Sequence, residues 1–541
     1  MVSVLIILYS DLLGSNETIL KSIFNNKPSI DERTECQLEW EQLNEHAFIR
    51  IPTVYFFTDL NQLCISIFRH QDYTYKYIFI VTITDDKNTK IEYHLENLKV
   101  NQNYLHNSHI ETVRASLVLM TTINDSKNFK MTLKVCMNEI QNCTKYPLDV
   151  NIRRSKPLES SDLKHSIICT EAYYFKKDKM QTFEWWIKIN RLSGYNQMIM
   201  YNHSLGGEKF NELFSRYKKF VKLNQLQCYP NFYGNQTQIK ERPFVSLEEL
   251  KKLYNKDIWP GLHTALEGYV FNECFLANRN KYKYISITDQ DESIAPRRLL
   301  ANTIDLFHLD NQDYKKLIKN YECYNKEESD SRLETYLNSV ITNLNLTNKL
   351  VSFHFKMSMH LKNVTIDIIF KQLGLFLSTL DETKPLNYTI LIEDQNDISE
   401  YNQKLKFWFS IRNKSELDYA KRIYKFHTDL IEPILKTNKQ LLDQVAAEPF
   451  NRVYILFGKS STDFLWGKTI HNTITTNDFT VHIGGQAITV PVEYGHLSHF
   501  RQVYNLHWGI FPITDLMFDF NYYNCYFKPI IKEFGYNLKE L

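Results

Sequence analysis

Acidic residues follow directly on an apolar run of the sequence. The run Lys283–Thr288 predicts a buried strand, and it is followed by Asp289, Gln290, Asp291 and Glu292. Side chains two residues apart on an extended chain point to the same side, so the carboxylates of Asp289 and Asp291 can face one cation. Carboxylate oxygens suit Mg²⁺ or Mn²⁺, above all when substrate phosphates complete the octahedron. Such an ion would neutralise the charge that develops on a leaving diphosphate.

An Asp-x-Asp pair at a strand end is usually a solvated turn. The segments around these acids favour a functional site instead. An amphipathic helix is predicted over Leu262–Arg279, with Val270 and Cys274 on its apolar stripe, directly before the strand. We interpret Cys274 as a helix-face hydrophobe or a disulfide partner. Open α/β sheets bind ligands beyond the carboxyl ends of their strands. The acids stand at such an end.

Two further segments belong to the same pattern. A helix is predicted over Phe183–Ser193, ended by Gly194, and the strand Gln197–Tyr201 follows it. Helix, tight turn and strand are the repeating step of an α/β domain. Trp185 and Trp186 lie on the predicted helix and are assigned to packing, because tryptophans at helical spacing are mostly core residues.

Three segments in this order resemble glycosyltransferase family 92. They read EWWIKINRLSGYNQMIMYNHS (Glu184–Ser204), NECFLANRNKYKYISITDQDESIAP (Asn272–Pro296) and GHLSHFR (Gly495–Arg501). They are similar to that family's EW…HRLLG…YDN, NDC…NR, D-x-DEF-x-P and late HYR motifs. The resemblance covers three islands between Ile168 and Arg501. It implies a GT-A-like mixed α/β sheet that binds a nucleotide sugar.

The resemblance also implies roles for single residues. Asp289 would contact ribose or metal, and Asp291 would ligate the metal, which is Mn²⁺ or Mg²⁺. His499 is a candidate further ligand, with a structural role as the open alternative. Lys468, in WGKTI where the family has KSI, would hold the diphosphate as a point charge.

The end of the strand Gln197–Tyr201 is predicted to receive uridine and ribose, at Tyr201 and Asn202. Asn202 stands where the family often has Asp, and it begins a glycosylation sequon, so a glycosylated Asn202 could not line the site. His482 and His496 are interpreted as structural residues, as a lone histidine usually is.

By resemblance the donor is UDP-galactose, the acceptor is a glycan and the transfer inverts to a β linkage. An inverting transfer needs a carboxylate near the acceptor hydroxyl. Glu493, Asp463 and Asp478 are all candidates in the late segment, and the catalytic residue stays unassigned. Ser293 and Phe500 replace the family's Phe and Tyr, so a catalytically inactive carbohydrate-binding protein on the same fold is the main alternative. A metal-dependent hydrolase is a second one.

The remaining pattern predicts the domains. Seven β-branched and aromatic runs between Phe48 and Arg154 predict an antiparallel β-sandwich over 31–160. The GT-A-like domain is expected over 161–541, with a β-rich insertion at about 340–412. Four strand-like runs are expected there (LVSFHFK, VTIDIIF, NYTILIE and LKFWFSI), followed by a helical pattern over 416–447 that is interrupted at Pro433.

Bulk properties narrow the partners and the compartment. The formal net charge of +2 offers no electrostatic footprint for nucleic acid. Asn-x-Ser/Thr sequons recur from Asn16 to Asn413, which is typical of a secretory protein, although a chain rich in Asn produces some by chance. Four cysteines within Cys169–Cys323 can form two disulfides.

The N-terminal residues 1–30 open on a short apolar run, Val2–Tyr9, far below the roughly 20 residues that span a bilayer and without the basic start of a signal peptide. We interpret this tail as a trimmed signal or membrane anchor, with a buried first strand as the alternative. The expected location is the Golgi lumen, in the secretory pathway, as a single-pass type II membrane protein.

Overall fold

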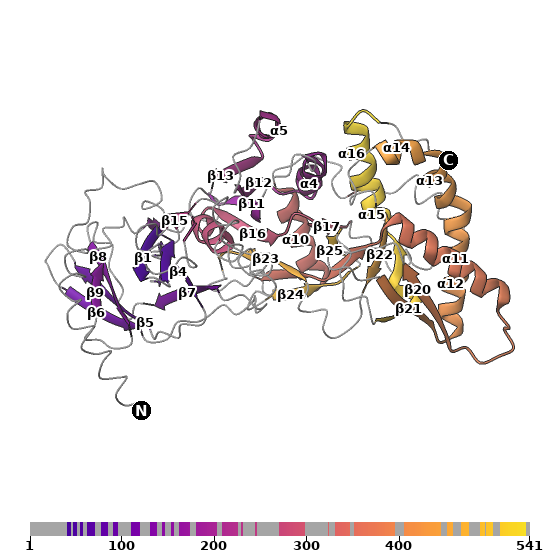
Figure 1. Ribbon diagram of the computed structural model, residues 1–541, viewed down its shortest axis with the longest axis horizontal. Helices are drawn as coiled ribbons and strands as arrows, with labels where there is room; N and C mark the ends of the chain where they lie inside the picture. The colour runs from indigo at the N-terminus through magenta and orange to yellow at the C-terminus, as the bar shows by residue number, and fades with distance from the viewer. Residues whose placement is uncertain are drawn as a thin grey trace, which may run out of the picture.

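The computed structural model describes the strands between residues 40 and 155 by their backbone, and parts of the chain after residue 161. The latter are 162–173, 180–202, 208–225, 229–230, 244–245, 270–297, 323, 331–346, 351–394, 405–444, 452–457, 467–474, 487–492, 494–500 and 509–536. The N-terminal strands lie at one end of the molecule and the C-terminal helices at the other, with the central sheets between them (Figure 1).

The N-terminal strands form two separate sheets. A six-stranded sheet contains β1 (Trp40–Asn44), β2 (Ala47–Arg50), β3 (Tyr55–Phe57), β4 (Gln62–His70), β7 (Ile110–Val118) and β10 (Arg153–Ser155). A four-stranded sheet contains β5 (Tyr77–Thr84), β6 (Lys90–Leu95), β8 (Lys130–Met137) and β9 (Cys143–Tyr146). All pairs are antiparallel except β3 with β10, which are parallel and differ from the predicted pattern. Each of the seven predicted runs overlaps a strand, the first run divides into β2 and β3, and β1 and β9 were not predicted. Their packing as a sandwich stays a prediction.

The main sheet has seven strands and is mixed, which confirms the predicted α/β class. Its order is β13 (Val221–Gln225), β12 (Gln197–Asn202), β11 (Lys164–Tyr173), β16 (Tyr282–Thr288), β23 (Lys468–Asn472), β18 (Ser352–Phe355) and β24 (Ala487–Val490). The first four strands are parallel to one another, whereas β23 is antiparallel to both of its neighbours. The strand that opens this sheet is β11, which the sequence reasoning did not identify.

Helix α4 (Met180–Leu192) joins β11 to β12, and α5 (Glu208–Tyr217) joins β12 to β13. Helix α4 ends where predicted, because Gly194 has a φ of 94°, a left-handed conformation that favours glycine. Its residues from Phe183 to Asn190 are all buried. The predicted packing role of Trp185 and Trp186 is therefore confirmed.

A second sheet of five strands lies beside the main one. Its order is β17 (Glu292–Pro296), β25 (Gly495–His499), β19 (Met357–His360), β22 (Tyr454–Phe457) and β27 (Leu516–Phe518). A third sheet contains β20 (Tyr388–Asp394), β21 (Leu405–Ile411) and β26 (Ile510–Pro512), and a short pair joins β14 (Tyr229–Pro230) to β15 (Phe244–Val245). Within the predicted insertion at 340–412, β18 and β19 thus pair with strands of the two central sheets. The domain boundaries themselves stay predictions.

The other helices with described bounds follow β17 in the chain; α10 lies beside the central sheets, and the later ones gather toward the C-terminal end (Figure 1). They are α10 (Arg332–Asn343), α11 (Asn363–Thr379), α12 (Lys414–Phe426), the π-helical turn η5 (His427–Ile431), α13 (Glu432–Thr437), α14 (Lys439–Gln444), the 3₁₀ turn η8 (Ile513–Asp515), α15 (Phe520–Tyr522), the π-helical turn η9 (Tyr523–Phe527) and α16 (Lys528–Glu533). Pro433 lies in the first turn of α13, which proline tolerates, so the predicted interruption is a change of helix type.

One predicted strand is wrong. The run VTIDIIF belongs to helix α11, and Ile366, Ile369, Phe370 and Leu373 form its buried face. These positions follow the helical spacing i, i+3, i+4, i+7. A short run with many β-branched residues is compatible with both the strand period of two and the helical period of 3.6. Over the full length of α11 the apolar residues follow the helical period.

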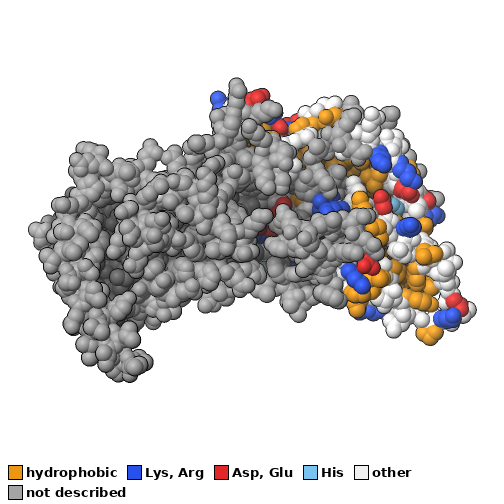
Figure 2. Space-filling view, viewed as in Figure 1, with side chains coloured by type: hydrophobic (Ala, Val, Ile, Leu, Met, Phe, Trp, Pro, Cys, Tyr) orange, Lys and Arg blue, Asp and Glu red, His pale blue; other side chains and the backbone are white. Residues whose placement is uncertain are grey.

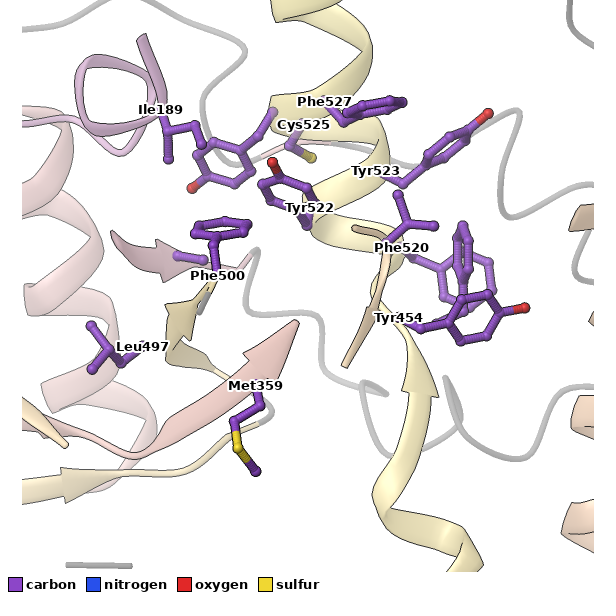
Figure 3. Packing of buried hydrophobic residues seen from close by; sticks show 14 of the residues in the cluster. Ile189, Met359, Tyr454, Leu497, Phe500, Phe520, Tyr522, Tyr523, Cys525 and Phe527 are labelled. Carbon is purple, nitrogen blue, oxygen red and sulfur yellow. The ribbon is translucent and has the colours of Figure 1, made fainter. Parts of the chain in front are cut away.

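Buried aromatic residues join the second sheet to the C-terminal helices. Phe500 after β25 and Tyr522 on α15 pack with ring centroids 5.2 Å apart, and Phe527 continues the same cluster (Figure 3). On the face shown in Figure 2, apolar patches alternate with side chains of both charges at the C-terminal end. No single charge sign dominates that described part of the surface.

Two disulfides link distant segments. Cys169 on β11 is bonded to Cys274 on the helix that leads into β16, and Cys323 is bonded to Cys525. Two disulfides were expected among the cysteines of Cys169–Cys323, and only the Cys169–Cys274 bond joins two of them. Cys525 supplies the partner of Cys323, and Cys228 lies outside the described residues. No helix in the described parts of the chain is long and apolar enough to cross a bilayer.

Candidate functional site

The site forms where parallel strands of the main sheet end. Strand β11 lies between β12 and β16, with Thr170 opposite Thr288 and Tyr173 opposite Asn202. The side chain of Tyr201 is buried, and Asn202 is placed by its backbone at the end of β12. The carboxyl ends of β12 and β16 therefore lie at one edge of the sheet, where open α/β sheets have their ligand sites.

The acidic residues after β16 form a turn, which corrects the expectation of an extended chain. The Glu292 amide donates to the Asp289 carbonyl at 3.2 Å, and the Asp289 amide donates to Glu292 Oε2 at 3.1 Å. The chain then reverses into β17. Alternation along a strand consequently does not apply, and Asp289 and Asp291 have different partners.

Asp289 is bound to Lys468, the first residue of β23. The Lys468 Nζ lies 3.1 Å from Asp289 Oδ2 and 3.2 Å from Glu292 Oε2, and only 1% of the lysine side chain is exposed. The preceding Gly467 permits this approach, because a Cβ there would lie 2.3 Å from His354 Cε1. The Lys468 ammonium thus lies against the acidic turn, with its charge shared between two carboxyl groups, and its predicted contact to a diphosphate stays a prediction.

Asp291 faces His499. Strands β17 and β25 pair with Glu292 opposite His499, and the Phe500 amide donates to the Asp291 carbonyl at 2.8 Å. This register brings His499 Nε2 to 3.7 Å from Asp291 Oδ1, with 31% of the aspartate side chain exposed. Two ligands at roughly 2.1 Å from one ion lie about 3–4 Å apart, so this pair fits a shared divalent cation.

Negative charge accumulates in the turn. Burial, and after it the nearby charges of Asp289 and Asp291, raise the pKa of Glu292 against the opposing effect of Lys468, and the net result is a pKa of about 8. One ammonium therefore stands against three carboxyl groups. A divalent cation would reduce this excess.

Hydrogen bonds hold the acidic turn and the start of β17 against helix α4. Trp186 Nε1 donates to the Glu292 carbonyl at 2.8 Å, and Ser293 Oγ donates to Asn190 Oδ1 at 3.2 Å. Ser293, where the family has Phe, is thus satisfied by a polar residue of α4. Glu184 of α4 does not reach the turn: it accepts hydrogen bonds from Arg216 and Tyr217 and ties α4 to α5.

The predicted metal ligands are only partly assembled. Within the described chain, the one group of three His, Cys, Asp or Glu ligand atoms lying within 4.8 Å of one another is formed by His360, His496 and Asp519. Asp289, Asp291 and His499 are more widely spread. The sequence reasoning did not find His360 or Asp519, since three elements distant in the chain bring this group together. The assignments of Tyr201, Asn202, Asp289, Asp291, Lys468 and His499 stay predictions.

Several other predicted residues lie outside the described parts of the chain. They are His482, Arg501 and the three candidate bases Glu493, Asp463 and Asp478. The structure therefore leaves the catalytic base unassigned.

Comparison with known proteins finds a family match in the middle of the chain. Residues 164–360, from β11 to the end of β19, match the sequence model of a glycosyltransferase family. That family is glycosyltransferase family 92, so the resemblance predicted from the motifs is confirmed over this segment. The match includes the acidic turn and ends before Lys468 and His499. No curated protein matches the chain.

Among solved structures, the chain is similar to core-mannan synthase A from Aspergillus fumigatus, crystallised in an Mn/GDP form. The sequences are 11% identical, and the match covers 41% of this chain and 50% of that one, with a TM-score of 0.17. The chain therefore spans half the length of that structure.

Proposed function

We propose that this protein is a metal-dependent glycosyltransferase that moves a sugar from a nucleotide diphosphate donor to a glycan. The observation that carries the proposal is the acidic turn Asp289–Glu292, which lies within the segment matched to the family, at the carboxyl edge of the main sheet. Asp291 faces His499 across that turn. A carboxylate oxygen suits Mn²⁺, and an imidazole nitrogen is a common ligand of divalent transition metals, so this pair could bind such an ion.

Asp291 and His499 are the proposed metal ligands, and Asp289 is the proposed contact to ribose or to the same ion. When bound, the ion supplies positive charge to the donor diphosphate. Lys468 has two functions in this arrangement. Its ammonium holds Asp289 and Glu292 in place, and it adds a fixed positive charge at the side of the turn.

The donor would extend from this turn toward the end of β12, where Asn202 follows the buried Tyr201. Because Tyr201 is buried, its contribution is to set the strand end and the backbone there. The family resemblance supports UDP-galactose as the donor and inversion to a β linkage.

The proposed location is the Golgi lumen in the secretory pathway. Two disulfides among the described residues support it, because disulfides persist in oxidising compartments. A membrane anchor before or within the N-terminal tail is part of the same proposal.

The direct test is a transfer assay with UDP-galactose, UDP-glucose, UDP-N-acetylglucosamine and GDP-mannose, each with Mn²⁺ or with chelator, and with a panel of oligosaccharide acceptors. We expect acceptor-dependent release of nucleotide with one donor only when Mn²⁺ is present, and its loss in Asp291→Ala. Asp418→Ala, which changes an exposed acid on α12, is the matched control. Release of free sugar without an acceptor would favour a hydrolase. Glycan binding with no donor turnover would favour the inactive binding protein.

A further inference from the structure

A second group of potential metal ligands lies on the other side of β25. His496 precedes His499 by three residues on this strand, so the two side chains point to opposite faces. His496 is fully buried, and its Nε2 lies 3.2 Å from Asp519 Oδ2. Ser498 Oγ also lies 3.1 Å from this nitrogen. Strand β25 therefore contributes to both candidate sites. His499 belongs to the partly exposed acidic turn, and His496 belongs to a buried group.

His360 supplies the second imidazole. It ends β19, which pairs with β25, and its side chain is fully buried. Its Nδ1 lies 2.7 Å from the Arg452 carbonyl, which fixes that nitrogen as the protonated donor. Nε2 then carries no proton and presents its lone pair. It has no hydrogen-bond partner in the described structure. A buried nitrogen of this kind is costly unless something else binds it.

Asp519 supplies a carboxylate from the C-terminal part of the chain. Its Oδ1 accepts from the Arg297 guanidinium at 3.1 Å and from the Tyr522 amide at 3.0 Å, where it caps α15. Its Oδ2 faces His496. Oδ1 thus fixes the position of Asp519, and Oδ2 faces the two histidines as a possible metal ligand.

We propose that His360, His496 and Asp519 hold a divalent transition metal of the zinc class in a closed structural site. Their ligand atoms lie within 4.8 Å of one another and all three residues are buried. Two imidazole nitrogens with one carboxylate oxygen favour zinc and its neighbours over Mg²⁺ or Ca²⁺. The Arg452 carbonyl and the Arg297 guanidinium act as outer contacts that orient His360 and Asp519.

The surroundings of the group point to a structural role. Phe500 stacks on the His360 ring at 4.3 Å, and Tyr522 meets the same ring edge-on at 4.9 Å. Both aromatic residues belong to the packing drawn in Figure 3. The ion would join β19 and β25 of the second sheet to the start of the C-terminal helices. The competing arrangement is an ion-free network in which Arg297 alone neutralises Asp519.

Elemental analysis of the untagged full chain distinguishes these arrangements. After dialysis against a weak chelator, we expect about one zinc-class ion per chain in the wild type and in Asp291→Ala, because the donor site is not the one occupied. His360→Gln and His496→Gln should lose it. The control His427→Gln should keep it, since His427 is another buried histidine that contacts Tyr454 and Phe370 away from this group.

A second measurement covers variants that fail to fold. The wild type should melt at a lower temperature after treatment with a strong chelator, and Zn²⁺ but not Mg²⁺ should restore it, in Asp291→Ala as well. A folded wild type that carries no transition metal after exposure to Zn²⁺, and whose melting temperature does not respond to it, would overturn the proposal. That result would leave the donor site and the proposed transferase activity untouched.

Discussion

The Lys468 ammonium lies 3.1 Å from the Asp289 carboxylate and joins β23 to the turn that follows β16. The lysine side chain is almost fully buried, so its charge is compensated by Asp289 and by Glu292 rather than by water. A buried cation shared by two acids fixes the shape of the turn before any ligand binds.

Lys468→Met should therefore destabilise the fold by about 3 kcal/mol, because removing one partner leaves buried carboxyl groups uncompensated. The free energy of unfolding from urea titration measures this loss. The double variant Lys468→Met/Asp289→Asn should recover part of it, since a neutral amide at 289 needs no cation. A loss below about 1 kcal/mol would mean that the pair contributes no more than a surface ion pair.

Trp186→Phe should destabilise the protein by about 1–3 kcal/mol, because the Glu292 carbonyl loses its buried donor. It should also weaken nucleotide binding, since this bond holds the acidic turn on α4. Trp185→Phe is the matched control: it also shortens a buried tryptophan, which packs on Phe527 and Phe534 instead. Equal effects of both variants on nucleotide affinity would contradict a positioning role for Trp186.

The ion pair of Glu334 with Lys283 and His165 gives a pH dependence. Burial alone would raise the pKa of Glu334, but hydrogen bonds and charge from Lys283 and His165 outweigh it, so the pKa is lowered from 4.5. A carboxyl group with a lowered folded-state pKa stabilises the fold above its unfolded pKa and loses that contribution as the pH falls through the folded value.

Glu334→Gln should consequently cost about 1 kcal/mol at neutral pH, and the difference from the wild type should shrink once the pH falls below 4.5. Thermal melting of both proteins across this range measures the effect. A difference that stays constant into acid would show that the variant acts through packing and not through the charge of Glu334.

The bond between Cys169 and Cys274 closes a sequence separation of 105 residues and ties β11 to the helix before β16. Replacing both residues with Ala should lower the free energy of unfolding by about 4 kcal/mol, chiefly because the unfolded chain gains conformational entropy when the cross-link is absent. Peptide mapping without reduction checks the pairing itself. A linked peptide of Cys169 with any other cysteine would refute the assignment.

The sequence predicted the elements around the site better than the contacts within it. Helix α4, its stop at Gly194 and the strand β16 follow local rules of periodicity and capping, so they were predictable. Strand β11 was missed because its continuous apolar run is only Ile167–Cys169, with polar residues on both sides. The strand assigned to VTIDIIF failed because β-branched residues in a short run do not separate strand from helix.

The geometry of the acidic turn depends on partners distant in the chain. Lys468 could be linked to Asp289 only through the family's motifs, and the pairing of Asp291 with His499 follows from the register of β17 with β25. The group of His360, His496 and Asp519 has no local signature, because three separate elements supply it. Short-range patterns carry no information about such long-range pairings.

The most direct test of the central claim is calorimetric titration of the folded chain with UDP, with and without Mn²⁺, for the wild type, Asp291→Ala and His499→Ala. We expect binding that requires Mn²⁺, is abolished in Asp291→Ala and is weakened about tenfold or more in His499→Ala, because one ligand of the ion is lost. Equal binding of UDP with and without Mn²⁺, or unchanged binding in Asp291→Ala, would contradict a metal-dependent donor site at this turn.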